Sequence, residues 1–484
     1  VARRHSVREP HARGRRNPGA VATREFTALR HTEQGDFPIR GPPHPARYPP
    51  AVAIHADPAR ARAAAVKIVA RLRELGHTAF FAGGCVRDEL LGLHPTDFDI
   101  ATSARPDQVA RTFRGTRLVG QAFGVVLVPG DDAQAMIEVA TFRADGPYSD
   151  RRRPDSIAFA DDVADAHRRD FTINALFLDP LAPATTIGES SIAGRVIDHV
   201  GGVSDLQRRI IRAVGIPAQR LCEDHLRALR AARFAARLGF ALDPATADAI
   251  RAHARDLAGV SRERIGEEVR RMLIHPRRAQ AISLLRDLDL LAPVLDLPST
   301  PPLRPMTCLS SLQGQDPAAP TEPFVAALAA WIVDSFAPAE PWPTAAISAT
   351  VGRIRAALCL SNDVRDGVVA VISGLVSLES EWEASGMAGR KRRASSRGFS
   401  GALALLKARN PDLAQRVSEE TNRLSVCFGG LSPAPLITGD LLVDQGLTPG
   451  PRFKRLLDLV YDAQLEGRIT TVSEGLELAR GLSV

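Results

Sequence analysis

The spacing of hydrophobic residues predicts two kinds of structure along the chain. Between about residues 56 and 200, short β-like runs alternate with helical stretches. The first helix is expected to begin near Pro58, and Gly76 is placed to end it. Inside this helix Ile68 and Leu72 recur at the spacing of one helix face. The alternation predicts a small mixed α/β domain.

The expected elements of this domain follow one another closely. They are a strand at 78–82, a Gly turn and short helix to about 91, a strand at 97–101, a helix at 106–113, β-like runs at 118–128 and 135–142, and an Arg-rich loop at 144–156. After residue 205 the pattern is helical. A Pro-rich passage at 293–343 interrupts it, and a Gly/Ser/Arg stretch at 385–401 is typical of a loop or linker. We therefore expect an α+β protein with a long helical remainder.

Composition narrows the class of protein. A length of 484 residues predicts roughly two to four domains. No apolar run reaches the roughly 18 residues of a membrane-spanning helix, so we expect no membrane partner. The five cysteines are scattered and never spaced as C-x-x-C, which argues against a disulfide framework or a structural zinc site. A reducing, cytoplasmic compartment is expected.

The net charge of +7 is concentrated at one end of the chain. Residues 1–50 hold ten Arg and four acidic residues, a net of +6, so the other 434 residues carry only +1. A segment this rich in Arg and Pro and poor in aliphatic residues is expected to be disordered. An RNA-binding arm, a transit peptide and translated upstream sequence stay open as explanations for it. The other 434 residues are therefore nearly neutral, so bulk charge does not mark them as a nucleic-acid binder, and any such binding would depend on local basic stripes and on shape.

The most informative polar residues are Asp97 and Asp99, which flank Phe98. Consecutive side chains on a strand point to opposite faces, so the two carboxylates share one face while Phe98 turns to the core. Two adjacent carboxylates repel each other unless a cation lies between them. Mg²⁺ accepts one or two carboxylates together with substrate phosphates. The pair is therefore a candidate catalytic magnesium site.

A glycine turn precedes this pair. Gly83 and Gly84 follow a predicted strand and open a predicted helix, so the backbone can approach a phosphate closely. Arg87 adds a guanidinium that is expected to contact the same phosphates. Strand, Gly-Gly turn, arginine and D-x-D at this spacing together predict a nucleotide site.

The run at 83–102 resembles the signature of the class II template-independent nucleotidyltransferases, which comprise the bacterial tRNA CCA-adding enzymes and poly(A) polymerases. Further matches follow in the family's order at 168–175, 201–206, 223–234 and 263–268. The resemblance is strong over about residues 56–275 and weak beyond them. It implies a polymerase-β-like mixed-sheet head followed by an all-helical neck, body and tail.

The segment 223–234 also has a physical interpretation. On one helix, its charged positions would form a slanting stripe: Asp224, Arg227, Arg230 and Arg233. A carboxylate accepts a hydrogen bond from an exocyclic amino group, and a guanidinium donates to the ring acceptor beside it. Cytosine and adenine share that amino-acceptor pattern. Asp224 with Arg227 could thus select C and A without a template.

The resemblance assigns further roles. It gives Asp224 and Arg227 this base-reading role and places Arg230 and Arg233 near the incoming nucleotide. It also gives Arg169 a nucleotide contact, with Asn174 nearby. A loop that the CCA- and A-adding members use to switch to adenine is matched by Glu138, Arg143, Tyr148, Asp150 and Arg153.

Composition and the resemblance together divide the chain into five parts. They are a disordered extension at 1–50, a catalytic head at 51–200, a helical neck for base recognition and RNA binding at 201–275, a helical body at 276–384, and a helical tail contacting tRNA at 385–484.

We expect a tRNA nucleotidyltransferase that uses CTP and ATP. The 3′-hydroxyl of tRNA attacks the α-phosphate, with Mg²⁺ on Asp97 and Asp99. The run at 120–125 lacks the basic residues that poly(A) polymerases of this family carry there, and 449–451 resembles the tail of tRNA-type members, so tRNA is favoured. A poly(A) polymerase and a catalytically silent RNA-binding protein are the alternatives. Oligomeric state and the choice among CCA, CC and A addition stay open.

Overall fold

The computed structural model describes residues 57–119, 124–130, 136–146, 157–187, 190–302, 304–312, 323–338, 341–427, 429–446 and 450–483. The extension expected at 1–50 lies outside these residues.

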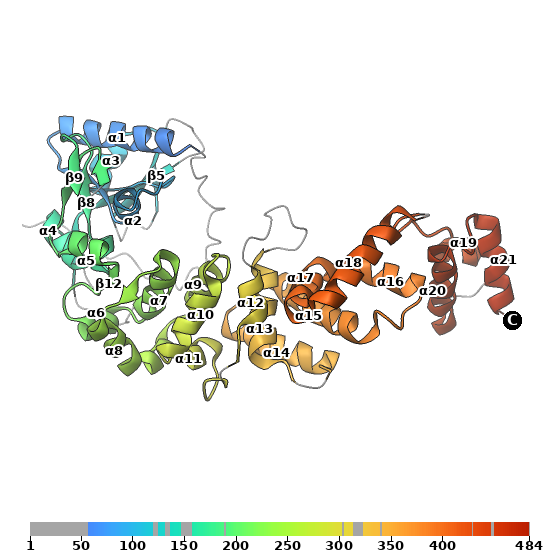
Figure 1. Ribbon diagram of the computed structural model, residues 1–484. Coiled ribbons are helices and arrows are strands. Elements are labelled where there is room, and N and C mark those ends of the chain that lie inside the picture. The colour runs from blue at the N-terminus through green and yellow to red at the C-terminus, as the bar shows by residue number, and fades with distance from the viewer. Residues whose placement is uncertain are drawn as a thin grey trace, which may run out of the picture. The chain divides into compact units, whose positions relative to one another are not determined.

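The head is built on a seven-stranded mixed sheet (Figure 1). In spatial order its strands are β11 (Arg195–Ile197), β8 (Phe177–Asp179), β1 (Ala79–Ala82), β2 (Asp99–Thr102), β5 (Met136–Thr141), β4 (Val125–Pro129) and β3 (Arg117–Leu118). Neighbouring strands run antiparallel except β2 and β5, which are parallel. The expected α+β fold with a mixed-sheet head is confirmed.

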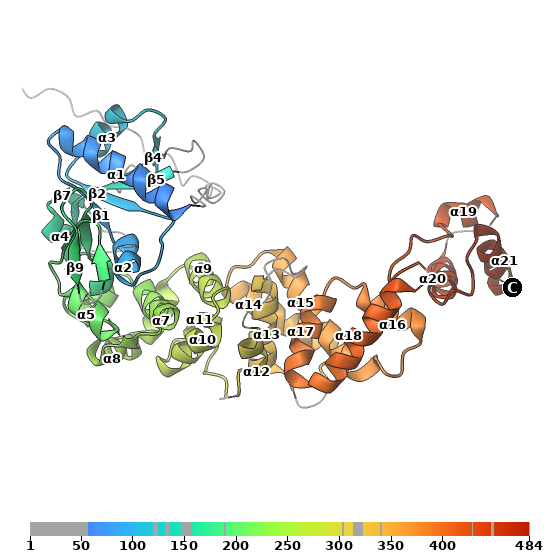
Figure 2. The same cartoon turned by 45° about the horizontal axis from the view of Figure 1, so that its top comes forward.

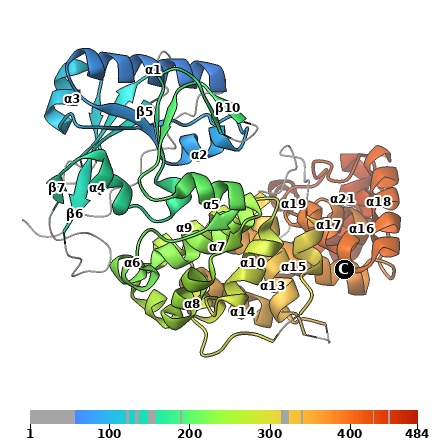
Figure 3. The ribbon, with the colours of Figure 1, turned by 60° about the vertical axis from the view of Figure 1, so that its left-hand side comes forward.

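Both faces of this sheet are covered. Helices α1 (Pro58–Glu74), α2 (Gly84–Leu90) and α3 (Pro106–Thr112) share one hydrophobic core with Phe81 of β1. Phe80, the neighbouring residue, faces the opposite way into a smaller cluster with Ala166 of α4 (Asp162–His167). Figure 3 shows α1 and α3 on one side of the strands and α4 on the other. Burial on both faces explains why β1 is apolar throughout.

The first helix agrees with its prediction. The side chain of Asp57 accepts a hydrogen bond from the backbone N–H of Ala59 at 2.9 Å and caps α1. Ile68 and Leu72 are buried, and Gly76 follows the helix with a φ of +82°.

Short elements complete the head and its junction with the helical part. They are the hairpins β6 (Arg143–Asp145) with β7 (Ile157–Phe159) and β9 (Thr185–Ile187) with β10 (Ser190–Ile192), the 3₁₀ turn η2 (Thr172–Asn174), and the parallel pair β12 (Ile210–Ile211) and β13 (Ala241–Leu242).

The rest of the described chain is helical. Its helices are α5 (Gly202–Arg208), α6 (Pro217–Glu223), α7 (Leu226–Leu238), α8 (Pro244–Ala252), η3 (Ala254–Gly259), α9 (Arg262–Leu273), α10 (Arg278–Asp287), α11 (Leu291–Leu295), α12 (Thr307–Ser311), α13 (Pro323–Phe336), α14 (Thr344–Ala357), α15 (Asn362–Glu381), α16 (Met387–Ala394), α17 (Phe399–Arg409), α18 (Pro411–Val426), α19 (Gly439–Asp444), α20 (Pro451–Leu465) and α21 (Val472–Ser483).

The last three helices have a hydrophobic cluster of their own. Leu442 of α19, Val460 of α20 and Ala479 of α21 are buried together, separately from the core that joins the head to the preceding helices. Figure 2 shows these three helices grouped next to one another. The chain therefore ends in a small, separately packed unit.

Two predictions about the helical part are wrong in detail. The Pro-rich passage contains α13, which is buried almost all round and so shows no amphipathic period. The stretch at 385–401 is not a linker but holds α16 and the start of α17. On α16 every third residue is buried, namely Ala388, Lys391 and Ala394, whereas the abundant Arg and Ser suggested a loop. None of the helices within the described residues is long and apolar enough to cross a membrane.

Candidate active site

The predicted carboxylate pair lies beside the start of β2. Phe98 is 2% exposed, and its ring centroid lies 5.1 Å from that of Phe81. Asp97 and Asp99 on either side of it are exposed. The predicted alternation is therefore present, although the strand begins only at Asp99 and Asp97 precedes it.

A third carboxylate belongs to this group. Glu138 of β5 lies directly opposite Asp99 of β2 in the parallel register. Desolvation by the surrounding protein and the negative charges of Asp97 and Glu138 raise the pKa of Asp99 to about 7. The positive charge of Arg169 opposes this rise. Although Asp99 keeps accessible surface, its carboxyl group is thus poorly hydrated. Desolvation and then the charge of Asp97 raise the pKa of Glu138 as well. The repulsion within this group would be relieved by a cation.

The donor set suits a hard divalent cation. Within the described residues, no three His, Cys, Asp or Glu side chains gather in a metal-binding arrangement. A cation on Asp97 and Asp99 would therefore take further oxygen ligands from a substrate, as Mg²⁺ does at nucleotide sites.

The turn after β1 requires glycine. Gly83 has a φ of +76°, and its N–H donates to the carbonyl oxygen of Leu176 at 2.9 Å. A Cβ atom at this position would lie 2.9 Å from Nη1 of Arg169. Gly84 is the first residue of α2. The turn thus brings Arg169 close to the backbone that joins β1 to α2.

Arg87 occupies a different position from the one expected. It is 2% exposed, and its guanidinium donates to Oδ1 of Asn174 and to Oδ1 of Asp88. It also lies over the ring of Phe234, 5.2 Å from the centroid. The prediction of a direct phosphate contact is therefore not matched by this geometry, because the guanidinium is enclosed beneath the turn.

Asn174 connects Arg87 to a chain of ion pairs. Its Nδ2 donates to Oδ1 of Asp170 at 3.1 Å, and Nε of Arg230 donates to Oδ2 of Asp170 at 2.8 Å. The charge of Arg230 and these hydrogen bonds outweigh burial and hold the pKa of Asp170 at about 2. On α9, Glu268 accepts from Nε of Arg233 at 2.6 Å. Arg230 and Arg233 thus each have a carboxylate partner.

The predicted stripe at 223–234 is interrupted. Helix α6 ends at Glu223, and Asp224 has extended backbone angles before α7 begins at Leu226. Asp224 therefore does not continue the stripe of Arg227, which lies on α7. The expectation of one helix was wrong because the spacing by three continues across a junction between two helices.

The two side chains predicted to read the base have separate partners. Oδ2 of Asp224 accepts from Nη2 of Arg264 at 2.6 Å. Nη1 of Arg227 donates to Oε2 of Glu223 and to the carbonyl oxygen of Arg220. The backbone N–H of Arg227 donates to the carbonyl oxygen of Asp224 at 3.0 Å, which keeps the two residues adjacent.

The predicted loop residues divide into two groups. Glu138 and Arg143 lie in strands β5 and β6 rather than in a loop. Tyr148, Asp150 and Arg153 lie outside the described residues.

Three partners of the predicted residues were not anticipated: Asp165, Arg264 and Glu268. Asp165 lies four residues before Arg169, the spacing of a helical ion pair, so a local pattern could have indicated it. Glu268 and Arg264 reach α7 and Asp224 from a different helix, and no local pattern indicates such contacts.

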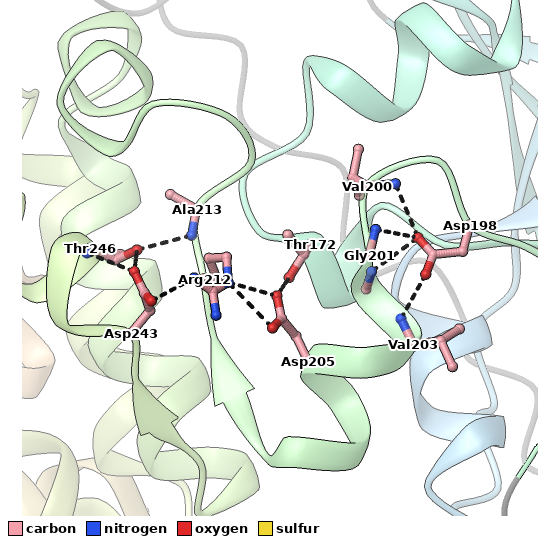
Figure 4. A network of polar contacts seen from close by, with 11 residues as sticks. Thr172, Asp198, Val200, Gly201, Val203, Asp205, Arg212, Ala213, Asp243 and Thr246 are labelled. Atoms are coloured by element: carbon pink, nitrogen blue, oxygen red, sulfur yellow. Dashed lines mark hydrogen bonds and ion pairs between the residues drawn. The ribbon is translucent and has the colours of Figure 1, made fainter.

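A polar network joins the head to the helices that follow (Figure 4). Oδ2 of Asp205 accepts from Oγ1 of Thr172 at 2.7 Å and from Nε of Arg212 at 3.0 Å. Nη1 of Arg212 donates to Oδ1 of Asp243 at 2.7 Å. A Cβ at Gly202 would lie 2.2 Å from the carbonyl oxygen of Thr172, so only glycine fits there. This network fixes the segment that carries Arg169 and Asn174.

Comparisons with known proteins identify similar sequences and similar folds. Residues 79–212 match the family model described as "Poly A polymerase head domain", and residues 239–301 match "Probable RNA and SrmB- binding site of polymerase A". The CCA-adding enzyme of Geobacillus kaustophilus is 42% identical over 229 residues, or 47% of this chain and 53% of that protein. That of Lactobacillus johnsonii is 40% identical over 228 residues, covering 47% and 54%. The chain thus aligns with about half the length of these curated relatives.

Solved structures extend the likeness in fold. The CCA-adding enzyme of Bacillus stearothermophilus in complex with CTP has a TM-score of 0.68 and 28% identity, covering 87% of this chain and 98% of that one. A CCA-adding enzyme solved with ATP has a TM-score of 0.63 and 19% identity, covering 89% and 97%. Together the sheet, the carboxylate pair and the glycine turn define a nucleotidyltransferase head. Residues 79–212 therefore match a poly A polymerase head domain, and residues 239–301 match the RNA-binding region described for the same polymerase.

Proposed function

We propose that this chain is a template-independent RNA nucleotidyltransferase that adds C, A or both to the 3′ end of tRNA. One observation carries the proposal: Asp97 and Asp99 flank buried Phe98, and the guanidinium of Arg169 lies next to the Gly83 turn, where its charge acts on Asp99. The curated CCA-adding enzymes that align with about half of this chain, and the solved structures that hold CTP, ATP or tRNA, support these three as partners.

The reaction transfers a nucleotidyl group. The 3′-hydroxyl oxygen of the RNA bonds to the α-phosphorus, the bond to the pyrophosphate oxygen breaks, and the hydroxyl proton leaves to solvent. Asp97 and Asp99 would hold Mg²⁺, which when bound offsets phosphate charge and makes the hydroxyl a better nucleophile. Arg169 would bind the triphosphate, and Gly83 lets the backbone approach it. Arg87 and Asn174 support this surface from below.

Base choice is assigned to Asp224 and Arg227. The carboxylate would accept from the amino group of C or A, and the guanidinium would donate to the adjacent ring acceptor. Arg264 and Glu223 hold these two side chains in the free protein. When a base binds, Asp224 and Arg227 would give up their hydrogen bonds to Arg264 and Glu223 and form hydrogen bonds to the base instead. A base without the matching donor and acceptor could not replace the bonds that are lost.

The remaining parts receive roles from the same proposal. Residues 51–200 form the catalytic head, 201–275 the neck, 276–384 the body, and 385–484 the tail that contacts tRNA. The separate cluster of α19, α20 and α21 supports a distinct tail. The five free thiols suit a reducing compartment, and we assign the reaction to the cytoplasm.

A three-substrate assay tests the proposal. The protein is incubated with Mg²⁺, labelled CTP or ATP, and either tRNA lacking CCA, tRNA ending in CC, or an unstructured RNA. Incorporation into the tRNAs alone is expected, and which nucleotide enters which tRNA distinguishes CCA, CC and A addition. Absence of incorporation into all three would contradict the proposal and favour a silent RNA-binding protein.

A poly(A) polymerase is the second candidate, favoured by the description of the matched head-domain model. It predicts long additions of A to the unstructured RNA, and no preference for tRNA.

A further inference from the structure

Asp165 of α4 accepts hydrogen bonds from two arginine side chains and from one backbone N–H group. Its side chain is 1% exposed. Oδ2 accepts from Nε and Nη2 of Arg169 at 3.1 and 2.9 Å. Oδ1 accepts from Nε and Nη2 of Arg168 at 2.8 and 2.6 Å, and from the backbone N–H of Arg143 at 3.3 Å. One carboxylate thus joins α4, the turn after it and the start of β6.

The contact with Arg169 fixes a guanidinium at the candidate nucleotide site. Nη1 of Arg169 also donates to the carbonyl oxygen of Asn174 at 3.2 Å, and the guanidinium lies 4.9 Å from the ring centroid of Phe177. A guanidinium has five N–H groups, and the hydrogen bonds of Arg169 to Asp165 and Asn174 use three of them. The other two N–H groups belong to Nη1 and Nη2; Nη1 lies next to the Gly83 turn, and the charge of Arg169 acts on Asp99, so this guanidinium lies at the candidate nucleotide site.

The electrostatics agree with a fixed pair. Arg169 and Arg168 lower the pKa of Asp165 below its usual range even though burial raises it. A carboxylate that accepts both N–H groups on one edge of a guanidinium sets the direction of the opposite edge. A side chain held this way loses less conformational freedom when it binds a phosphate.

We propose that Asp165 is a positioning residue, which orients Arg169 toward the triphosphate of the incoming nucleotide. This inference rests on the proposed nucleotidyltransferase function. Asp165 acts through Arg169 and does not touch the nucleotide itself. The competing explanation is a purely structural ion pair that stabilises α4.

The same helix offers a matched control. Asp161 caps α4, and its side chain accepts from the backbone N–H of Ala164 at 2.9 Å. Asp161→Ala removes a stabilising interaction from α4 but leaves Asp165 with both arginines. Asp165→Asn keeps the shape of the side chain and turns an amide group toward the guanidinium.

Steady-state kinetics with CTP and tRNA lacking CCA separate the two explanations. We expect Asp165→Asn to raise the KM for CTP about tenfold or more, because a hydrogen-bonded charge contact is lost, with the KM for tRNA unchanged. Asp161→Ala should lower the Tm and leave both KM values unchanged. An unchanged KM for CTP in Asp165→Asn, or an equal rise in Asp161→Ala, would overturn the inference.

A double-mutant cycle checks the route through Arg169. In an Arg169→Ala background, Asp165→Asn should have no further effect on CTP binding; independent effects would contradict the inference. If Asp165→Asn does not fold, Asp165→Glu serves instead, since it keeps the charge but moves the carboxylate away from the position that Arg169 engages. Calorimetric titration of CTP tests the inference without turnover. A wild-type protein that binds CTP but does not extend tRNA would contradict only the proposed function.

Discussion

Two groups of carboxylates in this chain differ in what surrounds them. Asp97, Asp99 and Glu138 face one another where β2 and β5 begin, and the pKa values of Asp99 and Glu138 are raised. Asp165 and Asp170 are more deeply enclosed, yet arginines lower their pKa values. We call these the facing group and the paired group.

The difference indicates that the facing group takes part in the reaction, whereas the paired group stabilises the structure around it. The fold satisfies the paired group with its own arginines, so these carboxylates order the site and need nothing further. The facing group keeps its repulsion in the free protein, which is a cost to stability that a bound cation and nucleotide would remove. Substitutions in the facing group should therefore lower activity without lowering stability, whereas substitutions in the paired group should lower stability.

The largest effect is expected in the facing group. Asp99→Asn should lower nucleotide incorporation by about 10³-fold, roughly 4 kcal/mol, because charge stabilisation of the transferred phosphate is lost. Its Tm should be unchanged or higher, since a poorly hydrated, repelled charge is removed. Asp107→Asn on α3, which is exposed, is the control. Retention of a tenth of wild-type activity by Asp99→Asn would contradict the assignment.

Asp224, which forms an ion pair with Arg264, tests whether a carboxylate outside both groups selects the base. Asp224→Ala should reduce discrimination against UTP and GTP by about 5- to 150-fold, or roughly 1 to 3 kcal/mol, because one contact of a bidentate pair is lost. Competition between labelled CTP and UTP measures it. Glu267→Ala, which breaks an exposed ion pair with Arg271 on α9, should leave selectivity unchanged. Unaltered selectivity in Asp224→Ala would count against the reading pair.

Asp170 tests the paired group through stability. Its folded-state pKa of about 2 lies below the ordinary 3.8, so the ionised carboxylate stabilises the fold above about pH 4, and this contribution is lost as the pH falls toward 2. Asp170→Asn should cost about 2 kcal/mol at pH 7. Urea unfolding should show the difference from wild type shrinking between pH 4 and pH 2. A constant difference over that range would contradict the ion-pair account.

The smallest effect is expected from the basic N-terminal segment. Removing residues 1–50, which carry +6 of the net charge of +7, should change activity on tRNA less than tenfold, because both groups of carboxylates lie elsewhere. The KM for tRNA at two salt concentrations measures the contribution of that charge. A tenfold or greater loss would show that the segment binds substrate.

Local patterns predicted much of the head. The helix from Pro58, the glycine turn and the exposed pair around Phe98 all follow from spacing over a few residues. Helix α13 could not be predicted from hydrophobic periodicity, because it is buried on every side and so has no polar face. Helix α16 was not predicted, because the Arg and Ser content of this stretch is typical of a loop.

The candidate site was predicted less completely, for a physical reason. The position of Glu138 beside Asp99 depends on which strands pair, and the partners of Asp224 and Arg233 come from α9. Burial of Arg87 likewise depends on Phe234 of α7 packing against it. Sequence spacing identifies residues that bear the chemistry, whereas tertiary contacts decide which of them reach the substrate.

The measurement that tests the central claim most directly is the effect of Mg²⁺ on thermal stability in the presence of CTP. A ligand that binds only the folded protein raises its Tm. The account predicts that Mg²⁺ with CTP raises the Tm of the wild type and of Asp107→Asn, but not that of an Asp97→Asn, Asp99→Asn double variant. An equal rise in the double variant would contradict the claim that Asp97 and Asp99 hold the cation.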